Sequence, residues 1–194
     1  MIDAVLTRNN VSFKFKITIK FLLSAGIVAL AVILPQIVHA AAGASGGVKW
    51  LPMYFPVLLA GCILGWKWGL GVGAFSPIVS FLITLAFGNP MPALARLPYM
   101  TAELATFAFV SGLFSKGIYK NRWLAFPATL LGSVSGRCVF LILAAIFESV
   151  SPLSFAVAWQ QVQTGLLAII LQAVIIPVIV MGLCAISDRA EDKK

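Results

Sequence analysis

The hydrophobic positions form long continuous runs along the chain instead of alternating with polar ones. A membrane-spanning helix needs about 20 mostly apolar residues, whereas the strands of a membrane barrel alternate apolar and polar residues. The runs therefore predict an all-α polytopic membrane protein, a six-transmembrane-helix bundle in which residues 1–194 form a single transmembrane domain. The predicted spans are roughly 17–39, 51–66, 69–87, 97–118, 124–147 and 161–186.

The apolar run 51–87 is too long for a single crossing. At about 1.5 Å per residue it would cover about 54 Å, well above the thickness of about 30 Å of a bilayer core. Lys67, which stands between Trp66 and Trp68 and is followed by Gly69, interrupts the run. A charge between two aromatic residues is typical of a membrane interface. We therefore expect two short helices, 51–66 and 69–87.

Composition excludes most other classes of protein. Hydrophobic residues make up 61% of the chain and charged residues 10%, against about 45–50% and about 25% in soluble domains. A water-soluble domain of this size would leave too much apolar surface exposed. An ordinary cytosolic enzyme, a disordered chain and a secreted disulfide scaffold are excluded. Cys62, Cys138 and Cys184 lie in apolar runs without the spacing of a metal site, so we expect buried, unpaired thiols.

The distribution of Lys and Arg fits an even number of spans with both termini cytoplasmic. With this orientation, eleven of the 14 basic residues lie inside, Lys49 and Arg96 lie outside, and Arg137 lies within a helix. The inner residues are Arg8, Lys14, Lys16, Lys20, Lys67, Lys116, Lys120, Arg122, Arg189, Lys193 and Lys194. Membrane proteins keep such an excess on the cytoplasmic side. The net charge of +8 therefore needs no nucleic-acid partner, and no basic run with interleaved aromatics indicates one.

The first 40 residues also resemble a signal peptide. A basic start and an apolar core precede Val38-His39-Ala40, a small-x-small site before Ala41. The apolar core of about 18 residues is longer than the usual core of about 7–15. Cleavage would also leave five spans and spoil the charge asymmetry, so we favour a retained first membrane helix.

Two charged residues lie clearly within the predicted spans. Glu103 stands near the outer end of 97–118, and Arg137 stands near the middle of 124–147, toward its outer half. A charge within a bilayer costs about 2.5–3.5 kcal/mol on insertion scales, so each needs a partner or a function. The two spans are consecutive and joined by a short loop, so they are expected to pack side by side. Glu103 and Arg137 then either form an ion pair that holds the fold or line a polar cavity, and the two interpretations are compatible.

Other polar and aromatic side chains are predicted at the same outer level. Together they predict a ligand pocket at the outer face, and the candidate binding residues are Trp50, Asn89, Arg96, Tyr99, Glu103, Arg137, Gln160 and Gln163. The inner half carries few polar side chains, with Gln172 as the main exception, so no polar stripe for a channel is present. The broken helices and repeats of a self-sufficient transporter are also missing. No motif for catalysis, metal binding or phosphate binding occurs, so we expect neither enzyme activity nor a cofactor in this chain.

Small residues recur at the four-residue spacing that lets helices approach closely. Such positions are Gly61, Gly65, Gly69 and Gly73, then Gly132 and Gly136, and finally Ala25 and Ala29. We expect the glycines to serve packing within the bundle. The alanine pair could equally face another subunit.

Several segments resemble the substrate-binding S components of energy-coupling factor (ECF) vitamin transporters. They are LPMYFPVLLAG at 51–61, GWKWGL at 65–70, Ser76-Pro77, NPMP at 89–92, LPYMTAEL at 97–104 and SGL at 111–113. The resemblance implies a multi-pass protein of a bacterial or archaeal cell membrane that captures a water-soluble vitamin with high affinity. It also implies a complex with one transmembrane coupling protein and two cytoplasmic ATPases, which use the ATP.

The resemblance further implies roles for particular residues. Ala25 and Ala29 match the AxxxA motif of the family's first helix, which contacts the coupling protein. Ligand residues are expected from the outer loops and the outer halves of the fourth to sixth helices. Arg96 and Arg137 give a slight preference for an anionic vitamin such as pantothenate, nicotinate or folate. If Glu103 neutralises Arg137, a neutral or cationic ligand is equally expected. The alternative is a small integral membrane protein that binds partners or lipid and transports no ligand.

Overall fold

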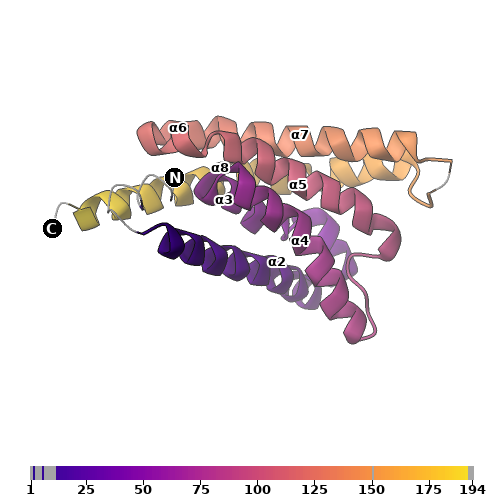
Figure 1. The fold of residues 1–194 in the computed structure, drawn as a ribbon. Coiled ribbons are helices and arrows are strands. Elements are labelled where there is room, and N and C mark those ends of the chain that lie inside the picture. The colour runs from indigo at the N-terminus through magenta and orange to yellow at the C-terminus, as the bar shows by residue number, and fades with distance from the viewer. Residues whose placement is uncertain (1, 3–5, 7–11, 150, 192–194) are drawn as a thin grey trace.

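The computed structural model describes residues 2, 6, 12–149 and 151–191, and within them the fold is all-helical. The elements in chain order are α2 (Phe13–Trp50), α3 (Tyr54–Leu64), α4 (Trp66–Ala86), η1 (Leu94–Arg96), α5 (Leu97–Leu113), α6 (Ser115–Lys120), η2 (Arg122–Leu124), α7 (Ala125–Ile146) and α8 (Phe155–Glu191). The long helices form an elongated bundle, in which the start of α2 and the end of α8 lie at the same end (Figure 1). The predicted all-α fold is confirmed for these residues.

Within the described residues, five helical segments are long and apolar enough to span a membrane. They are Phe13–Gly43, Gly46–Leu64, Trp66–Ala86, Arg122–Ile146 and Phe155–Ser187. The predicted span 97–118 is divided at Phe114 into α5, which has 17 residues, and the short α6. The count of six spans and the cytoplasmic position of the termini stay predictions.

The long apolar run is divided into two helices, as expected, but the break lies at Gly65. Gly65 has a φ of 84° and a ψ of 171°, a backbone conformation that residues with a side chain rarely adopt. Its N–H donates to the carbonyl of Gly61 at 3.0 Å and so closes the last turn of α3. Lys67 and its flanking tryptophans therefore belong to the first turn of α4.

The predicted outer loop between the first two spans is wrong, because α2 continues as helix to Trp50. Only Gly43, with a φ of 68° and a ψ of −171°, interrupts it. The carbonyls of Trp50 and Leu51 accept hydrogen bonds from the Gln172 side chain at 3.3 and 3.1 Å. Glycines have low helix propensity, which made this segment resemble a loop. The second candidate span consequently starts at Gly46.

Helix α5 packs against α3, α4 and α7. Glycines of these neighbours face its backbone: a Cβ at Gly69 would lie 3.1 Å from the Ala108 carbonyl oxygen, and a Cβ at Gly132 would lie 3.0 Å from that of Phe107. A Cβ at Gly73 would collide with the Leu104 carbonyl. The glycine pattern therefore serves helix packing and fixes the position of α5.

Replacing Gly73 by alanine is expected to destabilise the bundle by about 1–3 kcal/mol, the usual cost of overpacking. The added Cβ would lie 2.9 Å from the Cα of Ala105, and a helix backbone cannot give way as a flexible side chain can. Gly71 is the matched control, because a Cβ there meets nothing within 4 Å. Thermal unfolding in detergent compares the two variants. Equal stability of Gly73→Ala and Gly71→Ala would contradict this account of the packing.

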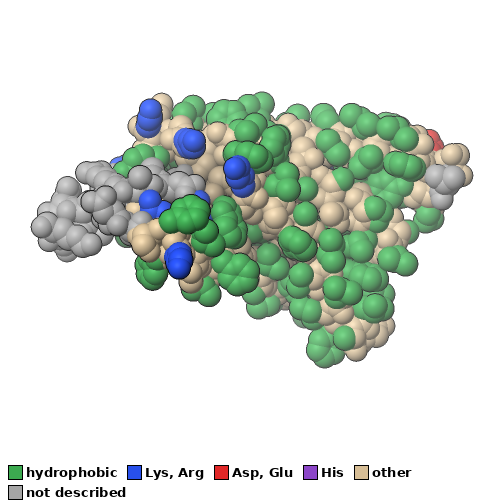
Figure 2. All heavy atoms as spheres, in the orientation of Figure 1, with side chains coloured by type: hydrophobic (Ala, Val, Ile, Leu, Met, Phe, Trp, Pro, Cys, Tyr) green, Lys and Arg blue, Asp and Glu red, His purple; other side chains and the backbone are tan. Residues whose placement is uncertain are grey.

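Basic side chains gather at one end of the molecule, where α2 and α4 begin and α6 lies (Figure 2). The basic residues there are Lys14, Lys16 and Lys20 of α2, Lys67 of α4, Lys116 and Lys120 of α6, and Arg122 of η2, which follows α6. Arg8, Lys193 and Lys194 lie outside the described residues, as does the side chain of Arg189. Cys62 and Cys184 are buried as expected, whereas Cys138 is exposed on α7. The basic end is the one that the positive-inside rule assigns to the cytoplasm.

Candidate ligand-binding site

A cavity of about 370 Å³ is lined in part by residues from the second halves of α2 and α4, whose beginnings belong to the basic end. Its lining comes from the second half of α2, residues 51–54, the segment 89–96 and single residues of α4, α5, α7 and α8. The polar lining residues are His39, Tyr54, Ser80, Asn89, Arg96, Arg137 and Gln161. The volume falls within the range of about 300–1,000 Å³ of small-molecule sites. An apolar wall with a few polar groups is the arrangement that such sites share.

Arg137 of α7 and Glu103 of α5 form the expected ion pair behind this wall. Arg137 Nη1 lies 2.9 Å from Glu103 Oε1, and the two side chains are only 8% and 0% exposed. Arg137 lines the cavity, whereas Glu103 does not. The pair thus combines the two interpretations of the sequence, because one member supports the fold while the other reaches the cavity.

Tyr54 of α3 holds the pair in place. Its hydroxyl donates to Glu103 Oε2 at 2.7 Å, and its ring centroid lies 4.8 Å from Arg137 Cζ. The other side of the ring packs edge-on against Phe107 at 4.9 Å. A guanidinium over an aromatic face gains a favourable cation–π contact. Glu103 Oε2 is thus hydrogen-bonded to Tyr54 while Oε1 faces Arg137 in the ion pair, and these contacts orient Arg137.

Several residues that line the cavity carry buried polar atoms without a hydrogen-bond partner among the described residues. The atoms are Arg137 Nε and Nη2, His39 Nδ1 and Gln161 Nε2. Gly165 leaves the arginine uncovered, because a Cβ at this position would lie 3.1 Å from Arg137 Nη2. Buried polar groups normally find partners in native structures. Their gathering in one cavity indicates a place for a polar ligand.

Two hydroxyl groups of α4 hold the segment that covers the cavity. Thr84 Oγ1 accepts a hydrogen bond from the N–H of Met91 at 2.7 Å. Ser80 Oγ donates to the Met91 carbonyl at 2.9 Å, and the Asn89 N–H donates to the Thr84 carbonyl at 3.1 Å. These bonds place Asn89 and the neighbouring prolines against the cavity.

Replacing Thr84 by valine is expected to loosen this segment while the bundle stays intact. The Met91 N–H loses its acceptor, so its amide should exchange with solvent about fivefold faster, which corresponds to about 1 kcal/mol for one hydrogen bond. Thr106→Val is the control, because Thr106 bonds only the Ala102 carbonyl of its own helix. Hydrogen exchange of peptides covering 87–96 measures the effect. Unchanged exchange in Thr84→Val would show that these hydroxyl bonds do not hold the segment.

The structure brings only some of the predicted ligand residues to the cavity. Asn89, Arg96 and Arg137 line it. Tyr99 instead packs against Phe140 in an apolar cluster, with ring centroids 6.5 Å apart.

The remaining candidates lie elsewhere on the molecule. Glu103 stands behind Arg137, and Trp50 is 42% exposed at the end of α2. Gln160 and Gln163 are exposed on α8 and do not line the cavity. Their neighbour Gln161 lines the cavity. The sequence indicated only that glutamines at the start of the last span lie at the depth of the pocket, and not which of them faces it.

His39 and Tyr54 are lining residues that the sequence did not single out for ligand binding. His39 looked like a single histidine at a membrane interface, which is usually structural. The available signal was weak: His39 is the only histidine of the chain and follows Pro35 and Gln36 at the outer end of the first apolar run.

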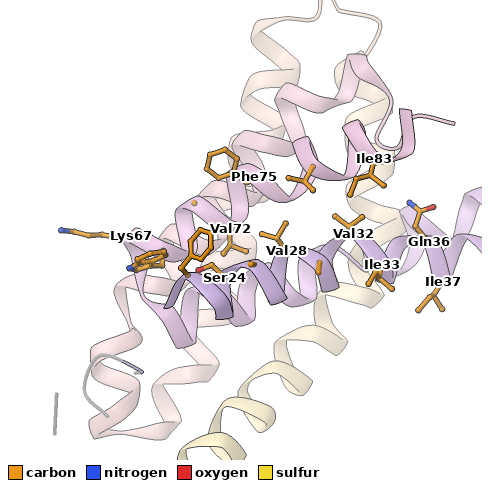
Figure 3. Close-up of a pocket in the computed structure, with 16 residues that line it drawn as sticks. Ser24, Val28, Val32, Ile33, Gln36, Ile37, Lys67, Val72, Phe75 and Ile83 are labelled. Carbon is orange, nitrogen blue, oxygen red and sulfur yellow. The ribbon is translucent and has the colours of Figure 1, made fainter. Parts of the chain in front are cut away.

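A second, larger hollow of about 760 Å³ runs between α2 and α4 (Figure 3). Its walls are almost entirely apolar, with Lys67 at one end and Gln36 at the other. Ala25 and Ala29 both line this groove, and both are exposed. We call it the α2–α4 groove.

Comparison with known proteins identifies the family. A family model described as "ECF transporter, substrate-specific component" matches residues 17–180. No curated protein and no solved structure matches the chain. Because the family model covers most of the 194 residues, the chain belongs to the family of substrate-specific components of ECF transporters.

Proposed function

We propose that this protein captures a water-soluble vitamin or related micronutrient at the outer face of the cell membrane of a bacterium or archaeon. The observation that carries the proposal is the cavity of about 370 Å³, in which Arg137, Gln161 and His39 present buried polar atoms without partners. The membership of the substrate-specific family supports the same role. The ligand binds between α2, the 89–96 segment, α7 and α8.

The position of the cavity favours capture over conduction. The lining residues of α2 and α4 lie in the second halves of these helices, whose beginnings belong to the basic end. Toward the basic end, α3, α4 and α5 pack through glycines such as Gly61, Gly69 and Gly112. A bound ligand therefore needs a further device to cross. This device is the energised module of one transmembrane coupling protein and two cytoplasmic ATPases. The ATPases use the ATP, and we expect no cofactor in this chain.

The α2–α4 groove is the surface that we assign to the coupling protein. It is apolar, and the small side chains of Ala25 and Ala29 leave room for a helix to approach closely. Both alanines are exposed in the chain alone.

The charges of the cavity favour an anionic ligand. Arg96 and Arg137 line it, and no Asp or Glu does so among the described residues. Glu103 balances the charge of Arg137 from behind the wall, so Arg96 carries the excess positive charge. Charge-assisted hydrogen bonds from arginine are strong and suit a carboxylate. Pantothenate, nicotinate and folates are the vitamins of this kind.

Uptake by cells tests the proposal. Cells that produce this chain, the coupling protein and both ATPases are incubated with a panel of labelled water-soluble vitamins. We expect ATP-dependent accumulation of one vitamin, lost when either this chain or the ATPases are omitted. Accumulation that is independent of this chain would contradict the proposed role.

A further inference from the structure

We infer that the free edge of Arg137, formed by Nε and Nη2, is the docking position for a carboxylate of the ligand, with Gln161 and His39 beside it. The inference rests on the proposed function and names the chemistry of its ligand. The site is not defined by charge alone, because residues of three helices, α7, α8 and α2, line the same cavity and carry unpartnered polar atoms among the described residues.

The surroundings of Arg137 leave two nitrogen atoms of its guanidinium without a hydrogen-bond partner among the described residues. Nη1 faces Glu103 at 2.9 Å, and the ring of Tyr54 covers the group at 4.8 Å. Nε and Nη2 have no hydrogen-bond partner in the described structure, although the residue is only 6% exposed. Arginine carries N–H donors in a fixed planar fork. The free Nε–Nη2 edge matches the two oxygens of one carboxylate in the bidentate geometry that arginine favours.

The protein's own carboxylate is kept away from this edge. Glu103 Oε2 accepts the Tyr54 hydroxyl at 2.7 Å, while Oε1 faces Nη1. Glu103 therefore fixes the orientation of Arg137 without covering Nε and Nη2. Glu103 and Tyr54 act as positioning residues in this arrangement.

Gln161 and His39 complete the subsite from two other helices. Gln161 Nε2 and His39 Nδ1 are buried without partners, and both residues line the cavity. An amide N–H can donate to a carboxylate, and so can a histidine whose Nδ1 carries the proton. One turn beyond Gln161, Gly165 has no side chain to cover Arg137 Nη2. The combined set offers donors to an anion, and the acid that pairs with Arg137, Glu103, lies at Nη1 and not at Nε or Nη2.

Matched pairs of charged and neutral vitamins test the inference on the purified protein. The probes are nicotinate with nicotinamide and pantothenate with its alcohol, pantothenol, together with folate and the cation thiamine. We expect one of the acids to bind. If that acid is nicotinate or pantothenate, it should bind at least 100-fold more tightly than nicotinamide or pantothenol, respectively. Binding of a neutral or cationic probe as tightly as any acid would overturn the carboxylate subsite and leave the capture function standing. Binding of no probe to folded protein would count against both.

Variants locate the subsite. Arg137→Lys keeps the charge but loses the planar fork, so we expect the affinity for the acid to fall at least 100-fold. Gln161→Leu should lower the affinity for the acid about tenfold with little change in the thermal stability of the protein. Thr164→Leu is its control, because Thr164 is exposed on the same helix and does not line the cavity. Unchanged affinity in both Arg137→Lys and Gln161→Leu would overturn the assignment.

Discussion

Replacing Glu103 by alanine is expected to destabilise the folded protein by about 3–5 kcal/mol, the cost of breaking a buried ion pair by removing one partner. Glu103 is fully buried, and its carboxylate is the only acidic group that the structure pairs with Arg137 among the described residues. The variant leaves the guanidinium buried without its counter-charge, and the Tyr54 hydroxyl loses its acceptor. Unfolding in detergent measures the loss. Glu148→Ala, which removes an exposed carboxylate after the end of α7, is the control and should change stability little.

The double variant Glu103→Met with Arg137→Met separates support of the fold from ligand binding. Apolar residues of similar volume often replace a buried ion pair without loss of stability. We expect the double variant to regain most of the stability that Glu103→Ala loses and yet to bind no ligand, because the cavity has lost Arg137. A stable double variant with unchanged ligand affinity would show that the pair serves the fold alone. A Glu103→Ala variant as stable as the parent would contradict the electrostatic account itself.

Replacing Ala29 by tryptophan is expected to abolish energised uptake and leave ligand binding intact. The indole would fill part of the α2–α4 groove and hold a partner helix away from α2. The ligand cavity is walled by other residues, from Pro35 onward, so the isolated subunit should bind its ligand with unchanged affinity. Uptake by cells, copurification with the coupling protein, and the dissociation constant of the isolated subunit measure the three expectations.

A neighbouring position on the same helix provides the control for Ala29→Trp. Leu30 is 49% exposed on α2 and does not line the groove, so Leu30→Trp should support uptake. Normal uptake and assembly by Ala29→Trp would remove the groove as the docking surface. Loss of ligand binding by isolated Ala29→Trp would mean that α2 shapes the cavity instead of serving only the partner.

Much of the fold was predictable because the apolar runs have the length of a bilayer crossing. The runs located the helices and the division near residue 65. The helix ends were less accurate: α8 begins at Phe155, several residues before the predicted span. The glycine-rich stretch around Gly43 resembled a loop, since its helical continuation depends on distant contacts such as Gln172 with Trp50 and Leu51.

The candidate site was predictable only where charge made a residue conspicuous. The pairing of Glu103 with Arg137 followed from the cost of charges within a bilayer. The choice of Gln161 over Gln160 and Gln163 depends on how α8 is rotated about its axis. Lipid-facing and core-facing sides of a membrane helix are both apolar, so hydrophobic periodicity does not determine this rotation. His39 was missed for the same reason.

The most direct test of ligand capture is a thermal-shift screen of the purified protein in detergent against water-soluble vitamins and their precursors. A ligand present at 100 times its dissociation constant adds about 2.7 kcal/mol to the stability of the folded state. We predict a clear upward shift in the melting temperature with one compound that carries a carboxylate. No shift with any member of the panel, for protein shown to be folded, would contradict vitamin capture and favour a membrane protein that binds partners or lipid without transporting a ligand.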